Sequence, residues 1–240
     1  MRTPRSVRTL EDFGRIRLSE SFFMRDFLYS DIATIHRMVN LPDDPELAIA
    51  AGRRLCEYLL EPLQATFGRL AIRSAYRSAE VNAFGNDRYK SCGSNETNRG
   101  LHIWDQRSKE GGMGAMASIV VPWLLDRTKQ GVTWQAMAWW IHDHLPYSEL
   151  QFYPKLLAFN IGWHEFPKRR ITSFVQPRGL LTKPGMDNHK GDHSTSIPAF
   201  PTLWCLRPPK RRRPPSVPAR RPRSGFGNGS PDLSRHSRPP

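Results

Sequence analysis

The last forty residues constrain the fold of this 240-residue chain most, because they are unsuited to forming a core. Residues 201–240 contain ten of the 36 Lys and Arg residues against one acid, Asp232, and ten of the 21 prolines. A segment of this composition buries too little apolar surface to offset the entropy that it loses on ordering. The sequence therefore predicts a disordered tail at 201–240 and a folded part within the first 200 residues.

The tail also carries most of the positive charge. Its net charge is +9 of the formal +14, so residues 1–200 are only mildly basic at +5. Arg-rich tails often bind nucleic acid or anionic surfaces by releasing counterions, and we expect at most a weak nucleic-acid contact here. Arg, Pro, Ser and Gly are also what GC-rich DNA encodes in almost any frame. A frameshifted end is thus the second interpretation, and both stay open.

Cysteine usage and the N-terminus bear on location. The three cysteines are an odd number without metal-type spacing, which favours a reducing compartment. The N-terminal residues include arginines but no apolar stretch typical of a secretory signal, and no run of about 18 apolar residues occurs. We therefore expect a cytoplasmic protein without a membrane span, with release by cell lysis, as for a phage enzyme, as the alternative.

Helical periodicity is clearest after Asp44. Asp44 is placed to cap a helix that begins at Pro45, and Gly68 is placed to end it. Its apolar stripe consists of Leu47, Ala51, Leu55, Leu59 and Leu63. Two further helices are predicted. One follows Ser19 or Ser21, with Phe23, Phe27, Ile32 and Ile35 on its apolar face, and one follows the cap Thr133.

Alternating patterns predict a small antiparallel sheet. Strands are expected near 70–74, at 101–105 (LHIWD), and in a hairpin formed by SELQFY and AFNIGWHEF, to which 170–177 adds a third strand. Residues 111–131 predict either a strand at 118–121 with a helix from Pro122, or one kinked helix. We expect an arm at 1–17, a domain at 18–175, an irregular extension at 176–200 and the tail at 201–240.

Three stretches carry the most specific patterns. Ile72–Asn82 reads IRSAYRSAEVN, Leu145–Tyr153 reads LPYSELQFY, and Ile161–Phe166 reads IGWHEF. They resemble the D-alanyl-D-alanine carboxypeptidase family of zinc peptidases. The resemblance implies the α+β fold shared with the hedgehog signalling domain, a small antiparallel sheet flanked by helices. It also implies cleavage of peptidoglycan peptides, with zinc held by His, Asp and His and water in the fourth position.

The first two zinc ligands of that family come from an S-x-H-x-x-G-x-A-x-D pattern, which this chain matches poorly. With Asp105 aligned as the Asp, Ile103 takes the place of the Ala and Asn98 that of the ligand His. His102 is the replacement ligand considered. In a regular strand His102 and Asp105 face opposite sides, so they converge on a metal only if a bulge lies between them. His164 matches the closing ligand.

The resemblance also assigns the remaining site residues. Arg77 corresponds to the arginine that grips the peptide's carboxylate, a task suited to the guanidinium fork, with a structural salt bridge as the alternative. Tyr76 and Asn98 are assigned to the substrate side. The general base of the family falls on Ile161. Glu165 is adjacent to the closing ligand, although a strand turns it away from His164.

The other histidines are not predicted to bind metal. His142 and His144 lie two residues apart, about 200° around a helix, so they cannot chelate together. His189 and His193 are four apart, but Gly185, Gly191 and Pro198 indicate a loop in which helical spacing has no meaning.

The expected function is that of a zinc metallopeptidase-like protein acting on peptidoglycan peptides, with Asp105, His164 and His102 as ligands. Two alternatives stand beside it. One is a catalytically degenerate binding module of the same fold. The other is a scaffold whose basic tail docks nucleic acid.

Overall fold

The computed structural model describes residues 1–196, and the predicted tail at 201–240 lies outside the described residues. The helices are α1 (Val7–Gly14), α2 (Asp31–His36), α3 (Pro45–Leu55), α4 (Glu61–Phe67), α5 (Ala79–Tyr89), α6 (Asn95–Asn98), α7 (Pro122–Thr128) and α8 (Trp134–His144). The strands are β1 (Ala71–Ser74), β2 (Gly114–Val120), β3 (Glu149–Phe152), β4 (Phe159–His164), β5 (Arg170–Ser173) and β6 (Gly179–Thr182). Short 3₁₀ turns occupy Met24–Phe27, Lys155–Leu157, Asp187–His189 and Ser194–Ser196.

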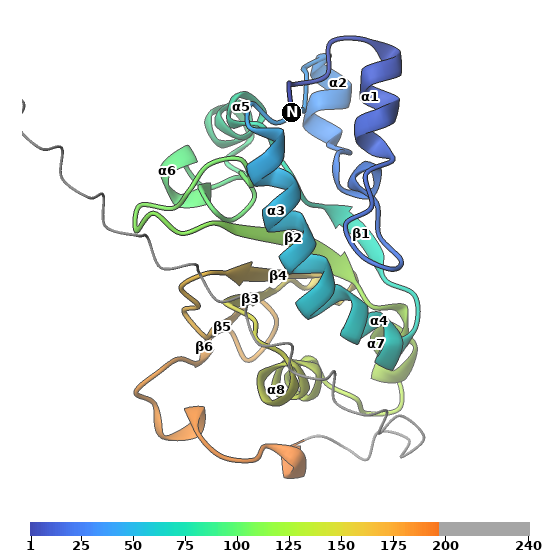
Figure 1. The fold of residues 1–240 in the computed structure, drawn as a ribbon. Helices are drawn as coiled ribbons and strands as arrows, with labels where there is room; N and C mark the ends of the chain where they lie inside the picture. Colours follow the sequence, from blue (N-terminus) through green and yellow to red (C-terminus); the bar gives the residue numbers. More distant parts are fainter. Residues whose placement is uncertain (197–240) are drawn as a thin grey trace, which may run out of the picture. The chain divides into compact units, whose positions relative to one another are not determined.

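The strands form one six-stranded sheet in the order β1-β2-β4-β3-β5-β6 (Figure 1). An α+β architecture is confirmed, but the sheet is larger than expected and mixed rather than antiparallel. The predicted third strand of the hairpin, β5, pairs parallel with β3. Strand β4 ends beside the start of β3, so a strand that follows at once along the other edge of β3 must run in the direction of β3.

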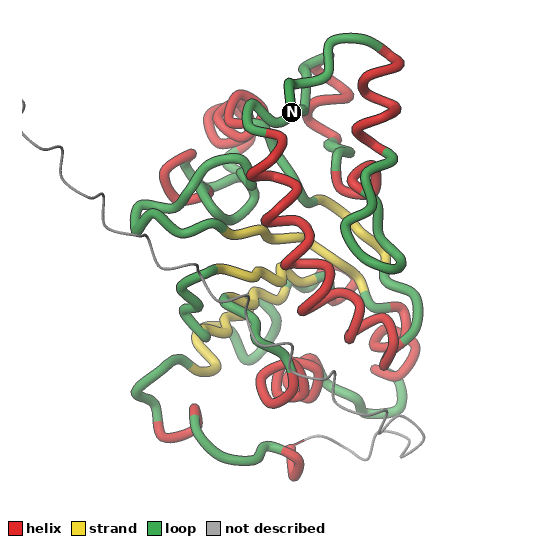
Figure 2. The backbone as a smooth tube through the Cα atoms, viewed as in Figure 1, coloured by secondary structure: helices red, strands yellow, loops and turns green. Residues whose placement is uncertain are grey.

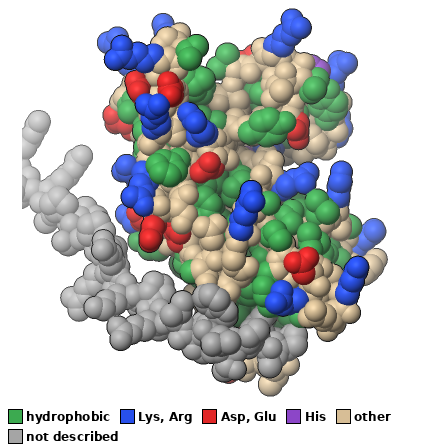
Figure 3. Space-filling view, turned by 90° about the vertical axis from the view of Figure 1, so that its right-hand side faces the viewer, with side chains coloured by type: hydrophobic (Ala, Val, Ile, Leu, Met, Phe, Trp, Pro, Cys, Tyr) green, Lys and Arg blue, Asp and Glu red, His purple; other side chains and the backbone are tan. Residues whose placement is uncertain are grey.

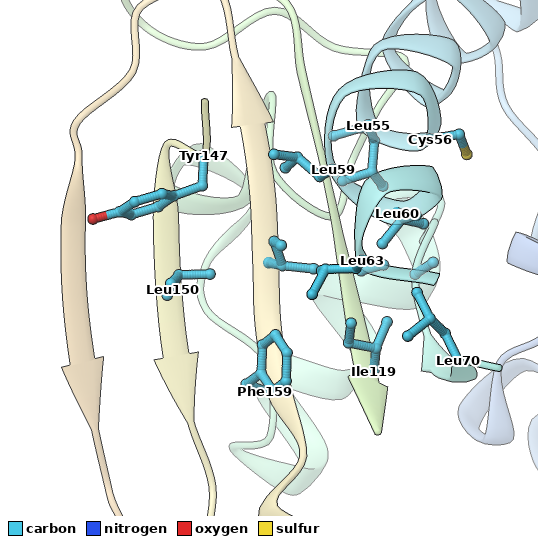
Figure 4. Close-up of a cluster of buried hydrophobic side chains, with 14 of the residues drawn as sticks. Leu55, Cys56, Leu59, Leu60, Leu63, Leu70, Ile119, Tyr147, Leu150 and Phe159 are labelled. Carbon is cyan, nitrogen blue, oxygen red and sulfur yellow. The ribbon is translucent and has the colours of Figure 1, made fainter. Parts of the chain in front are cut away.

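The helical segment from Pro45 to Phe67 packs across one face of the sheet. Asp44 caps α3 by accepting the N–H of Leu47 at 3.0 Å, and Gly68 ends α4 with φ of +79°, so both predicted boundaries are confirmed. Figure 4 shows its leucines directed at the strands, while Cys56 points away from them. Leu55, Leu59 and Leu63 are fully buried, and α8 adds its own apolar side chains to the same core.

One turn of this helical segment is wider than an α-helix. Cys56–Leu60 forms a π-helical turn between α3 and α4. It lies directly before Pro62, whose ring lacks an N–H and would clash with a carbonyl one turn earlier in a regular helix. The wide turn accommodates this proline without breaking the helix.

The other face of the sheet bears a polar row. Ser118 pairs with Asn160, Asn160 with Gln151, and Gln151 with Thr172, while Ser74 pairs with Ser118 after a bulge in β1. Directly paired residues project from the same face of a sheet. Their neighbours in sequence, such as Ile119 and Ile161, are fully buried on the helix side, so the row lies away from the core.

The segment LHIWD is not the strand predicted from its alternation. Residues 101–105 form turns within the long loop between α6 and β2 (Figure 2). Gly100 takes φ of +66°, and the carbonyl of Asn98 accepts N–H groups from both Leu101 and Ile103 at 3.0 Å. These local hydrogen bonds replace those of a strand.

Other boundaries differ from the expectations. Of the two alternatives for 111–131, the strand followed by a helix at Pro122 is confirmed, although β2 is longer than expected. The segment after Ser19 forms a 3₁₀ turn and the short helix α2, and Phe23 and Ile35 are 41% and 74% exposed, so that apolar face was predicted wrongly. Order does not fade at Pro177, because β6 joins the sheet. The predicted arm contains α1, whose Phe13 is buried.

Charges are dispersed over the side that Figure 3 shows. Lys and Arg side chains there stand among apolar and acidic ones and form no single basic patch. Among the described residues no helix combines the length and apolar character needed to cross a membrane.

Candidate functional site

Arg77 lies in the short connection between β1 and α5. Its backbone N–H donates to the carbonyl of His102 at 2.9 Å, and the next residue, Ser78, caps α5 through the N–H of Val81. The guanidinium donates from Nη1 to Asn82 Oδ1 at 3.2 Å and to Cys92 Sγ at 2.7 Å. Its Nε is buried without a partner. Burial lowers the pKa of Arg77.

No carboxylate pairs with Arg77 among residues 1–196. An arginine stays charged at any ordinary pH, so a partly buried positive charge is present without a carboxylate counter-charge among these residues. The structural salt bridge considered as the alternative role for Arg77 is absent from the described part of the chain.

A cleft of about 400 Å³ opens beside this guanidinium. We call it the Arg77 cleft and define it by Ser74, Arg77, Ser118, Tyr153 and Asn160, three of which belong to the polar row. Arg73 and Lys155 add two exposed cations to its wall, against one acid, Asp31. The cleft is therefore polar and net positive, which suits a small anionic ligand.

Tyr153 fixes part of this polar surface. Its hydroxyl donates to Gln151 Oε1 at 2.5 Å and accepts the amide of Asn160 at 3.0 Å. Burial raises the pKa of Tyr153, so the hydroxyl keeps its proton. The three side chains thus hold one another in place above the sheet.

Two asparagines support Arg77 from behind. Asn98 donates to Asn82 Oδ1 at 2.8 Å, the same oxygen that accepts Arg77, and Asn82 donates to the carbonyl of Gly93 at 3.0 Å. Asn98 is 6% exposed and Asn82 fully buried. The structure therefore places Asn98 in a network that orients Arg77 rather than on a substrate surface.

His102 has the hydrogen bond common to metal-binding histidines, but within residues 1–196 it belongs to no set of three converging ligand groups. Its Nδ1 donates to the carbonyl of Ala75 at 2.8 Å, leaving the lone pair on Nε2. Burial, and secondarily the charge of Arg77, hold the pKa of His102 well below its usual value, so the ring is neutral.

Asp105 is directed toward the chain before α3. Its Oδ2 accepts the N–H of Asp43 at 2.7 Å, and its Oδ1 is buried without a hydrogen bond near the equally unpaired hydroxyl of Tyr76. Burial raises the pKa of Asp105. Tyr76 is fully buried, with its ring 6.1 Å from that of Trp104, so its placement is in the core.

His164 is enclosed by glycines at the end of β4. Its Nδ1 accepts the N–H of Phe166 at 2.9 Å, and a Cβ on Gly100, Gly112 or Gly114 would meet its ring. It lines a separate cleft of about 250 Å³ where Lys168 pairs with Glu149 at 3.0 Å. Glu165 is exposed and accepts from the backbone of Met113 at 2.8 Å.

His102, Asp105 and His164 do not form a cluster. Within the described residues, the one set of three ligand groups whose donor atoms lie within 4.8 Å of one another consists of His142, Asp143 and His193. We call this set the histidine cluster, and it could hold a metal ion. The zinc ligand set implied by the resemblance therefore does not fit one ion in this structure.

Sequence reasoning missed the histidine cluster because it compared histidines by spacing alone. The prediction compared His142 with His144 and His189 with His193, whereas Asp143 bonds His193, 50 residues further on. The signal available was the density of histidine and aspartate in both segments, His142–His144 and His189–His193.

The Arg77 cleft and the histidine cluster are both defined by the geometry of their side chains. The Arg77 cleft offers an unpaired cation with polar neighbours, and the histidine cluster offers three converging donor groups. Comparison with known proteins yields no match to this chain, either among protein families, among curated proteins or among solved structures.

Proposed function

We propose that this protein binds the C-terminal carboxylate of a short peptide in the Arg77 cleft, as a binding module of the hedgehog/D,D-peptidase type. The resemblance favours peptides of the peptidoglycan class as ligands. The observation that carries the proposal is the Arg77 guanidinium, partly buried beside a cleft and without a carboxylate partner among the described residues.

Burying a charge without a counter-charge costs on the order of several kcal/mol after relaxation when burial is complete and less when it is partial, so folds seldom keep such a charge without a use. A ligand carboxylate supplies the missing counter-charge. It accepts two parallel N–H groups from a guanidinium, a geometry that lysine cannot offer. The net positive wall formed with Arg73 and Lys155 supports an anionic ligand as well.

The polar row supplies partners for the rest of a peptide. Ser118, Asn160 and Tyr153 present hydroxyl and amide groups along the floor of the cleft. A bound peptide carries unpaired backbone N–H and C=O groups that need such partners when water is displaced.

Metal-dependent hydrolysis is the alternative that the resemblance implies, and the side-chain geometry gives it less support. The donor atoms of His102, Asp105 and His164 do not converge, and the acid adjacent to His164, Glu165, is bonded to Met113. We therefore derive no hydrolytic step.

The test measures binding of D-alanyl-D-alanine, acylated at its N-terminus, by titration calorimetry, against the same compound with a C-terminal amide. We expect the free acid to bind and the amide to bind at least tenfold more weakly. Arg77→Lys should also lose about 10-fold or more, because a charge-assisted hydrogen bond contributes about 1.5–3 kcal/mol. Arg53→Lys is the matched control, since Arg53 is exposed on α3, which covers the other face.

Equal binding of acid and amide, or unchanged binding in Arg77→Lys, would remove the carboxylate role. Cleavage of the dipeptide that requires added zinc and disappears in His164→Ala would instead establish the metallopeptidase alternative.

A further inference from the structure

Two segments far apart in the chain meet at the end of α8. His142 and Asp143 lie on its last turn, and His193 is separated from β6 by residues 183–192, an irregular stretch that includes a 3₁₀ turn. The side chains of His193 and Asp143 are 11% and 16% exposed, and His142 is 6% exposed. Their donor atoms lie within 4.8 Å of one another.

Each imidazole is oriented by a partner outside the cluster. His142 Nδ1 bonds the hydroxyl of Tyr147 at 2.7 Å, and His193 Nε2 donates to the carbonyl of Asn188 at 3.0 Å. The ring of His193 also stacks on Trp139, with centroids 4.0 Å apart and planes 6° from parallel. Metal-binding histidines are oriented in this manner, through a hydrogen bond at the ring nitrogen that does not bind the ion.

The inner nitrogens face oxygen atoms. His193 Nδ1 donates to Asp143 Oδ1 at 2.6 Å, and His142 Nε2 contacts the carbonyl of His189 at 3.0 Å. Two imidazoles and a carboxylate form a nitrogen and oxygen set typical of zinc, whereas calcium and magnesium prefer oxygen ligands alone.

We propose that the histidine cluster binds one divalent transition-metal ion of the zinc class, which fastens residues 183–196 to α8. The ion replaces the proton between His193 Nδ1 and Asp143, which is released to solvent. It binds His142 at Nε2 after the Nε2 proton moves to Nδ1, where it donates to the hydroxyl oxygen of Tyr147. This inference is independent of peptide binding in the Arg77 cleft.

The surroundings support entry and retention of a cation. His142 and Asp143 line a cleft of about 470 Å³, to which Asp192 contributes a further carboxylate. Arg169 lines the same cleft and opposes a cation, while Asp143 and Asp192 together outweigh its charge.

The fastened segment is held mainly by polar contacts, such as the hydrogen bond from Asn188 to the carbonyl of Leu181 at 2.9 Å. The 3₁₀ turn Asp187–His189 contains no buried residue. An ion that binds only when this segment lies against α8 stabilises the docked arrangement by mass action.

The test uses the full chain, produced without a histidine tag, stripped with a chelator and titrated with zinc chloride. We expect one zinc per chain by elemental analysis after gel filtration, and a higher thermal midpoint with zinc than without. Magnesium and calcium should not raise the midpoint. Cobalt(II) should give absorption bands of a metal bound by nitrogen and oxygen.

Two variants and two controls assign the site. Asp143→Asn and His193→Gln should each lose stoichiometric zinc, and circular dichroism of the metal-free proteins verifies that they fold. His144→Gln, two residues along the helix and stacked on Trp140, should bind zinc as the unmodified chain does. His164→Gln should also retain it.

The proposal is overturned if the stripped chain takes up no zinc, or if both cluster variants retain it. Loss of zinc in His164→Gln but not in the cluster variants likewise overturns it, and moves the metal to β4.

Discussion

The Arg77 cleft and the histidine cluster differ in how far the protein satisfies its own polar groups. In the cleft, a partly buried guanidinium has no carboxylate partner among the described residues, and its buried Nε is unpaired. In the cluster, each ring nitrogen of His142 and His193 contacts an oxygen atom. An unpaired charge indicates a missing ligand of opposite sign. A set in which every group has a hydrogen-bond partner indicates a structural contact between two segments. A proton holds this contact together at the place where a metal ion would bind.

The difference also separates stability from function. Removing one partner of a complete network leaves the other groups unsatisfied, which costs free energy of unfolding. Removing an unpaired charge leaves nothing behind, so it should cost binding alone. Variants at the two sites, and at the enclosed His102 and His164, can therefore break or sharpen the comparison.

The largest effect is expected at Gly114, which forms the wall around His164. A Cβ there would lie 2.2 Å from the carbonyl oxygen of Gly100 and 2.5 Å from the His164 ring. The carbonyl belongs to a tightly bonded turn, so Gly114→Ala should lower the free energy of unfolding by about 3 kcal/mol or more. Urea unfolding followed by tryptophan fluorescence measures it.

Gly93→Ala is the control, because its Cβ would meet only ordinary contacts at 3.5 Å. An effect of Gly114→Ala below about 1 kcal/mol would show that His164 moves aside easily, as a cleft residue would, rather than packing as a fixed ring.

The second effect concerns the histidine cluster without metal. His193→Ala removes the hydrogen-bond partner of Asp143 and the ring stacked on Trp139. Hydrogen bonds to charged groups contribute about 1.5–3 kcal/mol, so we expect a loss near the lower end for this partly exposed pair. Hydrogen exchange should show that the loss of amide protection is confined to residues 183–196 and the end of α8. Unchanged protection there would mean that the cluster does not hold the segment.

Parts of the fold were predictable from the sequence. The helix from Pro45 was predictable with its cap and its end, because Asp44 and Gly68 act on their immediate neighbours. A strand at 118–121 followed by a helix from Pro122 was one of two predicted alternatives, because proline also acts on its immediate neighbours. Arg77 was selected because it lies in a sequence motif. The lack of a carboxylate partner for Arg77 among the described residues was not predictable.

The rest depends on contacts between distant segments. The parallel pairing of β5 with β3 follows from the edge of β3 at which the chain rejoins the sheet after β4, not from the composition of β5. The turns at 101–105 depend on Gly100 in a left-handed conformation, which overrides alternation. The histidine cluster joins residues 50 apart, so no spacing rule within one element finds it.

The third expected effect is a dependence of the free energy of unfolding on pH, which His102 causes. Burial lowers its pKa in the folded protein below the value of about 6.5 in the unfolded chain, so the unfolded state takes up a proton first as pH falls. The stabilising contribution is complete above pH 6.5 and decreases below it, by at most about 1.4 kcal/mol per pH unit for one proton. Unfolding free energies at pH 7.5, 6.5 and 5.5 measure the slope.

His102→Asn isolates this contribution from the other histidines, because the asparagine amide can still donate to the carbonyl of Ala75. The variant should be less sensitive to acid than the unmodified chain. Identical slopes would mean that His102 takes up its proton in the fold, for instance by moving toward water.

The smallest effect has the opposite sign and tests the cleft itself. Arg77→Met removes the unpaired charge and keeps much of the side-chain volume. Asn82 Oδ1 still accepts from Asn98 at 2.8 Å, and only the weak acceptor Cys92 Sγ loses its contact with Arg77. The free energy of unfolding should therefore stay unchanged or rise by up to about 1 kcal/mol, as when buried charges are replaced by apolar groups. Arg53→Met, at an exposed position of α3, provides the baseline, and the same urea titration serves both. A loss of 1 kcal/mol or more relative to Arg53→Met would show that the contacts of Arg77 with Asn82 and Cys92 satisfy the guanidinium within the fold. The cleft would then resemble the histidine cluster, a site complete without a ligand, and the argument for a bound carboxylate would lose its basis.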